Sequence, residues 1–290
     1  MKLLNEYLRE KFGCKVYKVS LNGGFTCPNR DGTLDTRGCI FCSQGGSGEF
    51  ASDPSLDITR QIEEGKKRVR SKTGDGKYIA YFQAYTGTYG DVETLRRLYT
   101  QALSHPEVVA LSIATRPDCL SYEVLELLSK LNKIKPVWVE LGLQTVNEKT
   151  AVYIRRDYEL AVFDDAMERL KRAGIETIVH VIIGLPGEGL DDYIRTVKYV
   201  CDHGASGIKL QLLHILKGTD LEKEYLQGRV RVLSEDEYIE ILRECVKYIP
   251  DNVVIHRLTG DGDKKILVAP LWSGNKKRVL NRIKREILNL

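Results

Sequence analysis

Short apolar segments alternate with longer amphipathic segments through most of the chain. Six of the apolar segments are rich in Val, Ile, Leu and Tyr and have the length of buried strands. Segments with helical periodicity fill most of the intervals between them. The predicted strands are Lys15–Leu21, Tyr78–Gln83, Val108–Ala114, Val137–Leu143, Thr177–Ile183 and Gly207–Leu213, and the predicted helices are Asp57–Ser71, Val92–Ser104, Ser121–Asn132, Ala161–Ala173 and Leu190–His203.

Residues that begin and end helices support these boundaries. Asp91, Ser121 and Asp191 stand where the first turn of a helix needs a side-chain acceptor. Gly174 follows the basic residues Lys171 and Arg172, as expected at the end of a helix.

The strand–helix rhythm repeats six times and indicates parallel strands joined by right-handed crossovers. Six units fall short of a closed eight-unit barrel. We therefore expect an α/β fold, a partial (β/α)6 TIM-type barrel, with a doubly wound sheet as the alternative. In both folds ligands gather at the carboxyl ends of the strands. We expect the barrel in residues 1–216, with a polar loop at 23–50. Residues 217–290 should form a C-terminal helical and strand extension that packs on the barrel, with helices near Glu235–Tyr248 and Asn275–Leu288.

Composition restricts the class of protein only a little. Apolar residues make up 42% and charged residues 29% of 290 residues, which is typical of a folded domain rather than a disordered chain. The net charge of +4 does not by itself indicate a nucleic-acid-binding protein. The N-terminus lacks the pattern of a secretory signal, and no apolar run is long enough to cross a bilayer. We therefore expect a cytoplasmic protein with no membrane partner.

Three of the seven cysteines form a close group. Cys27, Cys39 and Cys42 follow the pattern C-x11-C-x2-C in the polar loop after the first predicted strand. An odd total, with four scattered cysteines, argues against a disulfide framework. A 4Fe–4S cluster normally takes four cysteines, so three would leave one iron open for a small ligand. Two alternatives stay open: a redox pair of Cys39 and Cys42, or a zinc site completed by a distant cysteine, as in a non-catalytic zinc-binding adaptor.

Motifs along nearly the whole chain accompany these cysteines. They include Gly24–Thr33, Gly46–Phe50, Tyr81–Thr86, Ala114–Leu120, Glu140–Thr145, His180–Glu188, Gly207–Lys209, His256–Asp261 and Ala269–Trp272. Together they resemble the YtqA/YhcC-like (MnmL-like) family of small radical S-adenosylmethionine (SAM) proteins, which is related to the catalytic subunit of elongator.

The resemblance implies a radical SAM enzyme in the radical SAM form of the partial barrel. A 4Fe–4S cluster on Cys27, Cys39 and Cys42 would bind SAM at its open iron and cleave it to a 5′-deoxyadenosyl radical, which abstracts a hydrogen atom from the substrate. The implied partners are tRNA and a reducing electron donor such as flavodoxin or ferredoxin. The implied reaction is tRNA modification at the C5 side chain of the wobble uridine, from carboxymethylaminomethyl to aminomethyl (cmnm5U to nm5U). A small metabolite is the alternative substrate.

Polar residues at the strand ends are the candidates for holding SAM. The full set is Phe41, Gln83, Tyr85, Thr86, Thr115, Arg116, Glu140, Gln144, Arg156, His180, Ile182 and Gly184. Arg116 and Arg156 compete for the SAM carboxylate, and either could instead form a salt bridge with Glu140 or Asp118. Phe41 should pack near the adenine. His180 fits a core histidine with satisfied hydrogen bonds equally well.

Four residues are candidates for contacting the substrate: Asp118, Tyr158, Lys209 and His214. Tyr158 lies in a segment that departs from the family pattern. The family tends to read Asn-Arg-Gly-His-Asp where this chain has Arg155-Arg156-Asp157-Tyr158-Glu159. Only Arg156 is retained.

Two basic clusters are candidates for contacting RNA phosphates. One comprises Lys66, Lys67, Arg68, Arg70 and Lys72, and the other comprises Lys276, Lys277, Arg278, Arg282, Lys284 and Arg285. Charge alone favours solvated helix faces. The resemblance favours RNA, with Tyr85 and Tyr158 as possible stacking partners for the target base.

Overall fold

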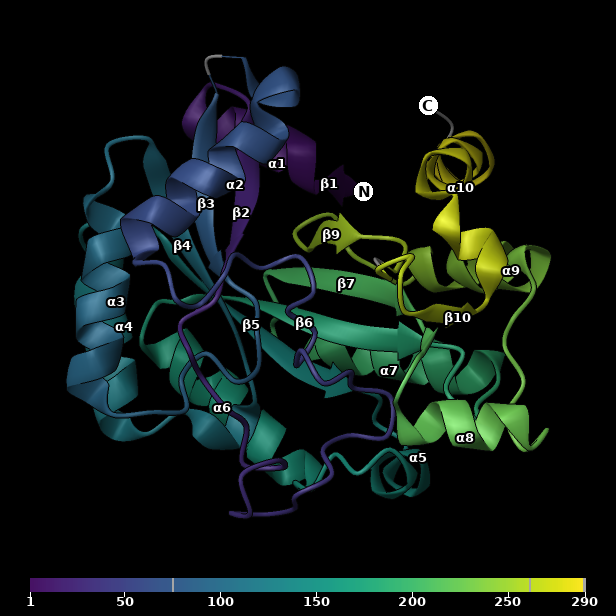
Figure 1. The fold of residues 1–290 in the computed structure, drawn as a ribbon. Helices are drawn as coiled ribbons and strands as arrows, with labels where there is room; N and C mark the ends of the chain where they lie inside the picture. Colours follow the sequence, from purple (N-terminus) through teal and green to yellow (C-terminus); the bar gives the residue numbers. More distant parts are fainter. Residues whose placement is uncertain (75, 261, 289–290) are drawn as a thin grey trace.

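An eight-stranded parallel sheet curls into an open half-barrel with helices on its outer side (Figure 1). The computed structural model describes residues 1–74, 76–260 and 262–288, without the side chains of residues 72 and 73. The strand order is β1-β9-β7-β6-β5-β4-β3-β2. The strands are β1 (Lys2–Leu3), β2 (Val16–Leu21), β3 (Lys77–Phe82), β4 (Val108–Thr115), β5 (Val137–Gln144), β6 (Glu176–Ile183), β7 (Gly207–Leu212) and β9 (Val254–Arg257), and β8 (Ile215–Leu216) pairs separately with β10 (Leu267–Ala269).

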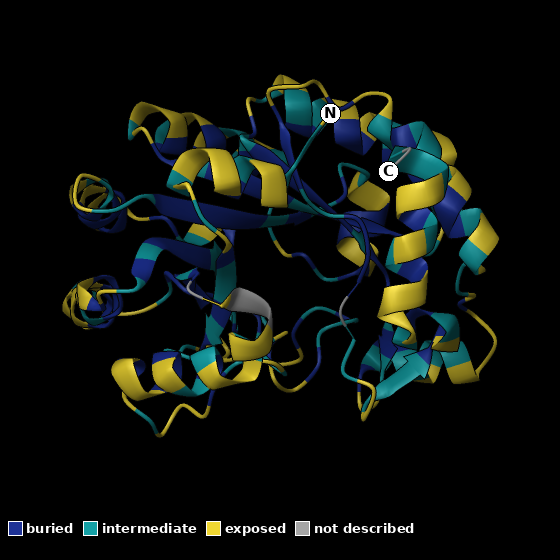
Figure 2. Cartoon of the chain, turned by 90° about the horizontal axis from the view of Figure 1, so that it is seen from above, coloured by how far each residue is buried: buried dark blue, intermediate teal, exposed yellow. Residues whose placement is uncertain are grey.

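The helices cover the convex side of the sheet and close its ends. They are α1 (Leu4–Phe12), α2 (Ile58–Thr73), α3 (Val92–Ser104), α4 (Tyr122–Asn132), α5 (Glu148–Tyr153), α6 (Leu160–Arg172), α7 (Leu190–Asp202), α8 (Asp220–Leu226), α9 (Glu235–Val246) and α10 (Lys276–Ile283). Short helical turns are Pro117–Cys119, Leu271–Gly274 and Lys284–Leu288. Figure 2 shows buried strands in the middle and exposed outer helix faces. In the described part of the chain, no helix has both the length and the apolar character needed to cross a membrane.

The predicted fold class is confirmed. The six predicted strands correspond to β2 through β7, and the five predicted helices to α2, α3, α4, α6 and α7. Parallel pairing throughout the sheet excludes the antiparallel folds. The strand order runs in one direction from β2 to β7 without the reversal of a doubly wound sheet, which leaves the partial barrel.

The sheet also contains two strands that the hydrophobic pattern did not reveal. β9 pairs with β7, and β1 pairs with β9, so two short segments from opposite ends of the chain complete one edge of the half-barrel. Strands this short carry too few residues for a readable period. The C-terminal part of the chain therefore contributes to the barrel sheet as well as packing on it.

Helix ends follow the expected capping chemistry at most positions. The side chains of Asp91 and Ser121 accept hydrogen bonds from the backbone N–H groups of Thr94 and Val124. The prediction of Asp191 as the start of a helix is wrong by two residues. α7 is capped at Gly189, whose N–H donates to Asp192. The capping acceptor thus lies inside the first turn rather than before it.

The lumen of the barrel is closed at the amino ends of the strands. Helix α1 inserts Leu8 below Trp138, and the two residues belong to one buried apolar cluster. The other buried members of that cluster are Val16, Ile79, Ala110 and Ile178, from four different strands. This plug leaves only the carboxyl end of the barrel open for a ligand.

A long loop, residues 22–57, crosses that open end between β2 and α2 (Figure 1). Backbone hydrogen bonds fasten it to distant segments: Thr86 N–H donates to Thr26, Ile40 N–H to Ile154, and Leu221 N–H to Ile40. The cysteine loop therefore forms a fixed roof over the strand ends.

Candidate active site

A cavity of about 190 Å³ lies between this roof and the strand ends. It gathers most of the residues that the sequence nominated. Lining it are Cys27, Cys39, Cys42, Phe41, Gln83, Tyr85, Thr86, Thr115, Arg116, Glu140, Gln144, Arg156, Tyr158, His180 and Lys209. Residues from the loop and from five strands or their ends thus converge on one space.

Four nominated residues do not line the cavity. Ile182 is buried in an apolar cluster with Ile40. Gly184 lines a smaller hollow beside Glu188. His214 packs against Gly260 and Gly262. Asp118 faces a groove on the other side of the loop and pairs with Arg116.

The three cysteines line the cavity without converging on one point. Among the described residues, a set of three ligand atoms lying within 4.8 Å of one another occurs only at Glu63, His105 and Glu107, so Cys27, Cys39 and Cys42 form no such set. Zinc–sulfur bonds of about 2.3 Å would bring the three sulfur atoms closer than that. Thiols spread around a shared space fit the separate irons of a 4Fe–4S cluster better than a single zinc ion.

The loop around the cysteines is held by an arginine that the sequence reasoning overlooked. Arg30 donates from Nη2 to the carbonyls of Cys42 (2.8 Å) and Ser43 (2.6 Å). Burial raises the pKa of the Cys39 thiol to about 12 and also raises that of Cys42, where Arg30 opposes the effect. The positive charge of Arg30 beside the cysteines would offset the negative charge of their thiolates.

Five non-glycine residues have a positive φ in the described chain, and all lie in or beside this site. Ser47 (63°), Tyr85 (58°) and Gln144 (66°) line the cavity, while Arg155 (56°) and Asp157 (58°) flank Arg156. Side chains disfavour this region, and such strain concentrates at functional sites. The roof is tight enough to need glycine at Gly46, where φ is +59° and an added Cβ would lie 2.4 Å from the Tyr85 ring.

The two candidate arginines are engaged differently. Arg116 lines the cavity and donates to Asp118 through Nε (2.9 Å) and Nη2 (2.7 Å), with a longer bond from Nη2 to Asp157 O (3.5 Å). Arg156 is almost fully buried and donates to Thr145 O (2.8 Å), Tyr158 O (3.1 Å) and Glu148 (3.1 Å). Arg116 is therefore better placed to meet a ligand carboxylate, whereas Arg156 stabilises the turn that carries Tyr158.

Tyr158 connects that turn to the cavity wall. Its hydroxyl donates to the carbonyl of Gly142 (2.5 Å), and its ring lies below the guanidinium groups of Arg156 (4.6 Å) and Arg116 (5.3 Å). Cation–π contact and a backbone hydrogen bond fix its orientation.

An ionic network forms the floor of the cavity, one layer above the apolar plug. Glu140 is fully buried, accepts from Ser112 (2.6 Å) and His180 (2.8 Å), and forms ion pairs with Lys18 and Lys209. Burial alone would raise the pKa of Glu140, but the two lysines hold it well below its usual range. Burial lowers the pKa of His180 to about 4, and the charge of Lys209 adds to the effect, so this histidine is neutral.

The network supplies Glu140, nominated above as a SAM contact, with partners from within this chain. Lys18, from β2, reaches Glu140 on β5 across the lumen. The sequence could have indicated Lys18 as a site residue, because it is a lysine inside the apolar strand Val16–Leu21 and a buried charge needs a partner. Tyr81, Gln211 and Arg257 also line the cavity and were not nominated.

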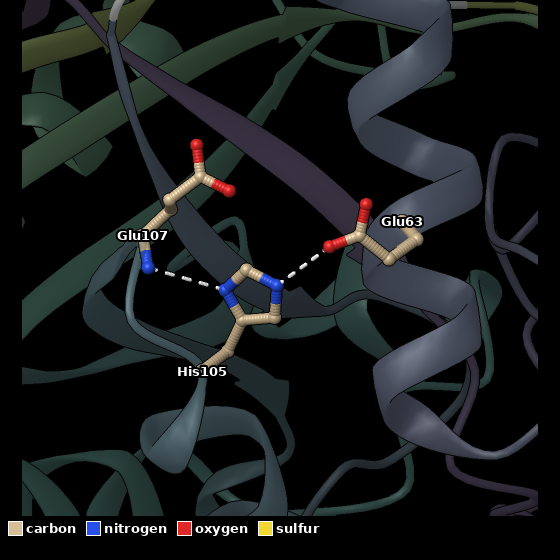
Figure 3. A group of neighbouring side chains, drawn as sticks. All are labelled: Glu63, His105 and Glu107. Carbon is tan, nitrogen blue, oxygen red and sulfur yellow. Dashed lines mark hydrogen bonds and ion pairs between the residues drawn. The ribbon is translucent and has the colours of Figure 1, made fainter.

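The Glu63, His105 and Glu107 group is a second candidate metal centre, at the amino end of β4 (Figure 3). His105 Nδ1 accepts from the Glu107 N–H (3.2 Å), so Nε2 carries the proton donated to Glu63 (2.8 Å). The ammonium of Lys66 pairs with both carboxylates. Because these side chains already satisfy one another, the group links α2 to β4 rather than offering an open ligand set.

Comparison with known proteins agrees with the geometry. The profile of the radical SAM superfamily matches residues 33–200, and that of the radical SAM C-terminal domain matches residues 205–289. The chain is 46% identical to protein YtqA of Bacillus subtilis (strain 168) over 286 residues, which cover 99% of this chain and 89% of that protein. It is 27% identical over 171 residues to a tRNA uridine(34) acetyltransferase of Methanocaldococcus jannaschii, covering 58% of this chain and 31% of the relative.

Among solved structures, Elp3 of Methanocaldococcus infernus with residues 1–46 deleted matches with a TM-score of 0.68 and 18% identity. The match covers 93% of this chain and 63% of that chain, and it shows a shared fold. The profile matches and the end-to-end similarity to YtqA establish that the chain belongs to the radical SAM superfamily, whose enzymes use a 4Fe–4S cluster and SAM.

Proposed function

We propose that this radical SAM enzyme modifies the C5 side chain of the wobble uridine of tRNA, in a step of the cmnm5U to nm5U type. The observation that carries the proposal is the cavity, where three cysteines and a polar floor line one space at the carboxyl ends of the strands. The similarity to a tRNA uridine(34) acetyltransferase supports uridine 34 as the target.

In this proposal Cys27, Cys39 and Cys42 hold the cluster, and Arg116 meets the SAM carboxylate. Phe41 and the ends of β3, β4 and β5 line the walls, including Gln83, Tyr85, Thr86, Thr115 and Gln144. When bound, the cluster and SAM supply a 5′-deoxyadenosyl radical for hydrogen-atom abstraction. The residues of this chain orient the two reactants and exclude water from the space between roof and floor.

A groove outside the cavity supports an RNA substrate. It runs between Phe50, in the cysteine loop, and residues 260, 262–265, 273, 274 and 276. The Phe50 side chain is exposed, and Lys264, Lys265 and Lys276 line the same groove. An exposed aromatic ring beside several lysines matches the stacking and phosphate contacts of single-stranded nucleic acid.

Several side chains of the two basic clusters form ion pairs within the protein, so the clusters would attract RNA phosphates less strongly than their charge in the sequence indicates. Lys66 and Lys67 pair with acidic residues on α2 and before β4, and Arg278 pairs with Glu235. Arg282 is engaged by Asp236 and Glu286. The groove beside Phe50 is therefore our preferred path for the RNA, with a flavodoxin- or ferredoxin-type protein as the electron donor.

The deciding experiment is nucleoside mass spectrometry of tRNA after reaction with anaerobically reconstituted enzyme, dithionite and SAM. The substrate is tRNA from a strain that lacks the enzyme. SAM is the oxidant in this step: the radical takes a hydrogen atom from the carboxymethyl carbon, and loss of a proton and of one electron, which replaces the electron supplied by the reductant, would leave an imine. Water then hydrolyses the C–N bond of the imine after the radical step, which gives the aminomethyl nucleoside and glyoxylate. Loss of the carboxymethyl group from the wobble nucleoside, together with glyoxylate release, is the expected result, with the Cys39→Ala variant as the inactive control. An unchanged nucleoside profile, together with SAM cleavage stimulated by a small metabolite, would overturn the tRNA assignment.

A further inference from the structure

The floor of the cavity holds two buried ammonium groups for one carboxylate. Lys18 and Lys209 both pair with Glu140, which is the only carboxylate that lines the cavity within the described residues. The side chain of Lys209 is 4% exposed and that of Glu140 is fully buried. A surplus cation in such an environment is costly unless a counter-anion joins it.

The neighbouring strand adds a further cation beside Lys209. Arg257 on β9 stands next to Lys209 in the parallel ladder, and it also lines the cavity. In the same ladder Lys209 stands next to the neutral His180 on β6. The side of the floor formed by β7 and β9 is thus the more positive side.

The Tyr81 ring offsets this charge only in part. The ammonium groups of Lys18 and Lys209 lie 4.7 Å and 5.0 Å from its centroid, and the Tyr81 hydroxyl is 3.5 Å from Lys209 Nζ. Burial lowers the pKa of Lys209 to about 7 although Glu140 attracts its proton, and Lys18 and Arg257 add repulsion. An anion bound here would relieve that repulsion.

The floor lies well below the cysteines. Lys209 stands three residues before the end of β7, and Glu140 four before the end of β5. These offsets correspond to about 10 Å and about 13 Å along the strands. A group that reaches the floor therefore belongs to a molecule that enters past the three cysteines. The reacting carbon of that molecule would lie between the floor and the cysteines.

We infer that Lys209 and Arg257 bind a carboxylate of the substrate at the floor of the barrel. This inference rests on the proposed function and names the part of the substrate that the floor recognises. The carboxymethylaminomethyl side chain ends in a carboxylate, whereas the aminomethyl product has none. The floor thus distinguishes substrate from product by charge, and the loss of the anion favours product release.

The test compares two anticodon stem-loop RNAs that differ only at the wobble side chain. One ends in a carboxylate and the other in the matching carboxamide. Their affinities for the reconstituted full chain are measured with SAM but without reductant, so no turnover occurs. The proteins are wild type, Lys209→Met, Arg257→Gln and, as a control, Lys130→Met on the exposed face of α4.

Wild type and Lys130→Met should bind the carboxylate RNA about tenfold or more tightly than the amide, because a charge-assisted hydrogen bond in a buried site is worth that much. Lys209→Met and Arg257→Gln should lose most of this preference while the affinity for SAM stays within about twofold. Thermal melting shows whether a variant has failed to fold. If one of these two variants fails to fold, the RNA preference of the other variant tests the inference. A wild type that does not distinguish the two RNAs would overturn the inference.

Two further outcomes separate the possible failures. If Lys209→Met weakens SAM binding and keeps the preference between RNAs, the floor serves SAM and the inference is wrong. Addition of dithionite then tests the reaction itself. Tight carboxylate-dependent binding without a changed nucleoside would refute the proposed reaction and leave the floor assignment intact. Equal binding and turnover of both RNAs would refute the floor assignment alone.

Discussion

Asp118 holds the guanidinium of Arg116 through two parallel hydrogen bonds, at 2.9 Å from Nε and 2.7 Å from Nη2. Arg116 lines the cavity and Asp118 does not. The pair therefore assigns Asp118 a positioning role: it orients the arginine that is available to a ligand carboxylate. The sequence nominated Asp118 as a substrate contact, with a salt bridge to Arg116 as the alternative.

Asp118→Asn should slow SAM cleavage about tenfold or more, because the guanidinium loses its charged, bidentate partner. The measurement is 5′-deoxyadenosine formed by the reconstituted enzyme with dithionite, together with the affinity for SAM. Asp165→Asn, which removes the partner of Arg169 on α6, is the control. An unchanged SAM affinity in Asp118→Asn would contradict the positioning role.

Replacement of any one of Cys27, Cys39 and Cys42 by alanine should abolish the iron–sulfur absorbance and SAM cleavage. A cluster needs all three thiolates. Cys14→Ser, near the amino end of the barrel, should keep both properties. Iron and sulfide analysis after anaerobic reconstitution provides the measurement. A colourless wild-type protein that takes up zinc and no iron would instead support the zinc-adaptor alternative.

Asp157→Gly should stabilise the protein by about 0.5–1 kcal/mol. Asp157 is exposed and has a φ of 58°. This backbone conformation costs a residue with a side chain about 1–2 kcal/mol, whereas it costs glycine nothing. The greater conformational freedom of glycine in the unfolded chain offsets part of this gain in stability. Urea unfolding measures the difference, and Asp165→Gly inside α6 should be destabilising. A less stable Asp157→Gly variant would show that the aspartate side chain outweighs the strain.

Glu188 should make the stability of the protein depend on pH. Burial raises its pKa from 4.5 to about 7, although Thr145 donates to Oε1 at 2.5 Å. The folded state then binds the proton more tightly than the unfolded state, so the contribution of Glu188 is full below pH 4.5 and is lost as the pH rises through 7.

Glu188→Gln should therefore gain stability relative to wild type as the pH rises from about 5 to about 8. Unfolding midpoints in urea across this range provide the measurement. The control is Glu93→Gln, on the exposed face of α3. A constant difference between Glu188→Gln and wild type would mean that Glu188 ionises normally in the folded protein.

Much of the barrel could be predicted because its signals are local. Long apolar runs identified β2 through β7, and Asp91, Ser121 and Gly174 marked helix ends through contacts within a few residues. β9 and β1 escaped because their pairing depends on partners far away in the chain.

The candidate site likewise has one part that the sequence predicts and another that depends on contacts between distant segments. The chain alone nominated the three cysteines, through their spacing, and the polar residues at the strand ends. Only the tertiary structure decided how those residues are used: Lys18 meets Glu140 across the lumen, Asp118 holds Arg116, and Arg156 is buried in its own turn. Spacing and periodicity reflect interactions between near neighbours. A charge partner three strands away is set by the curvature of the sheet, which no local pattern encodes.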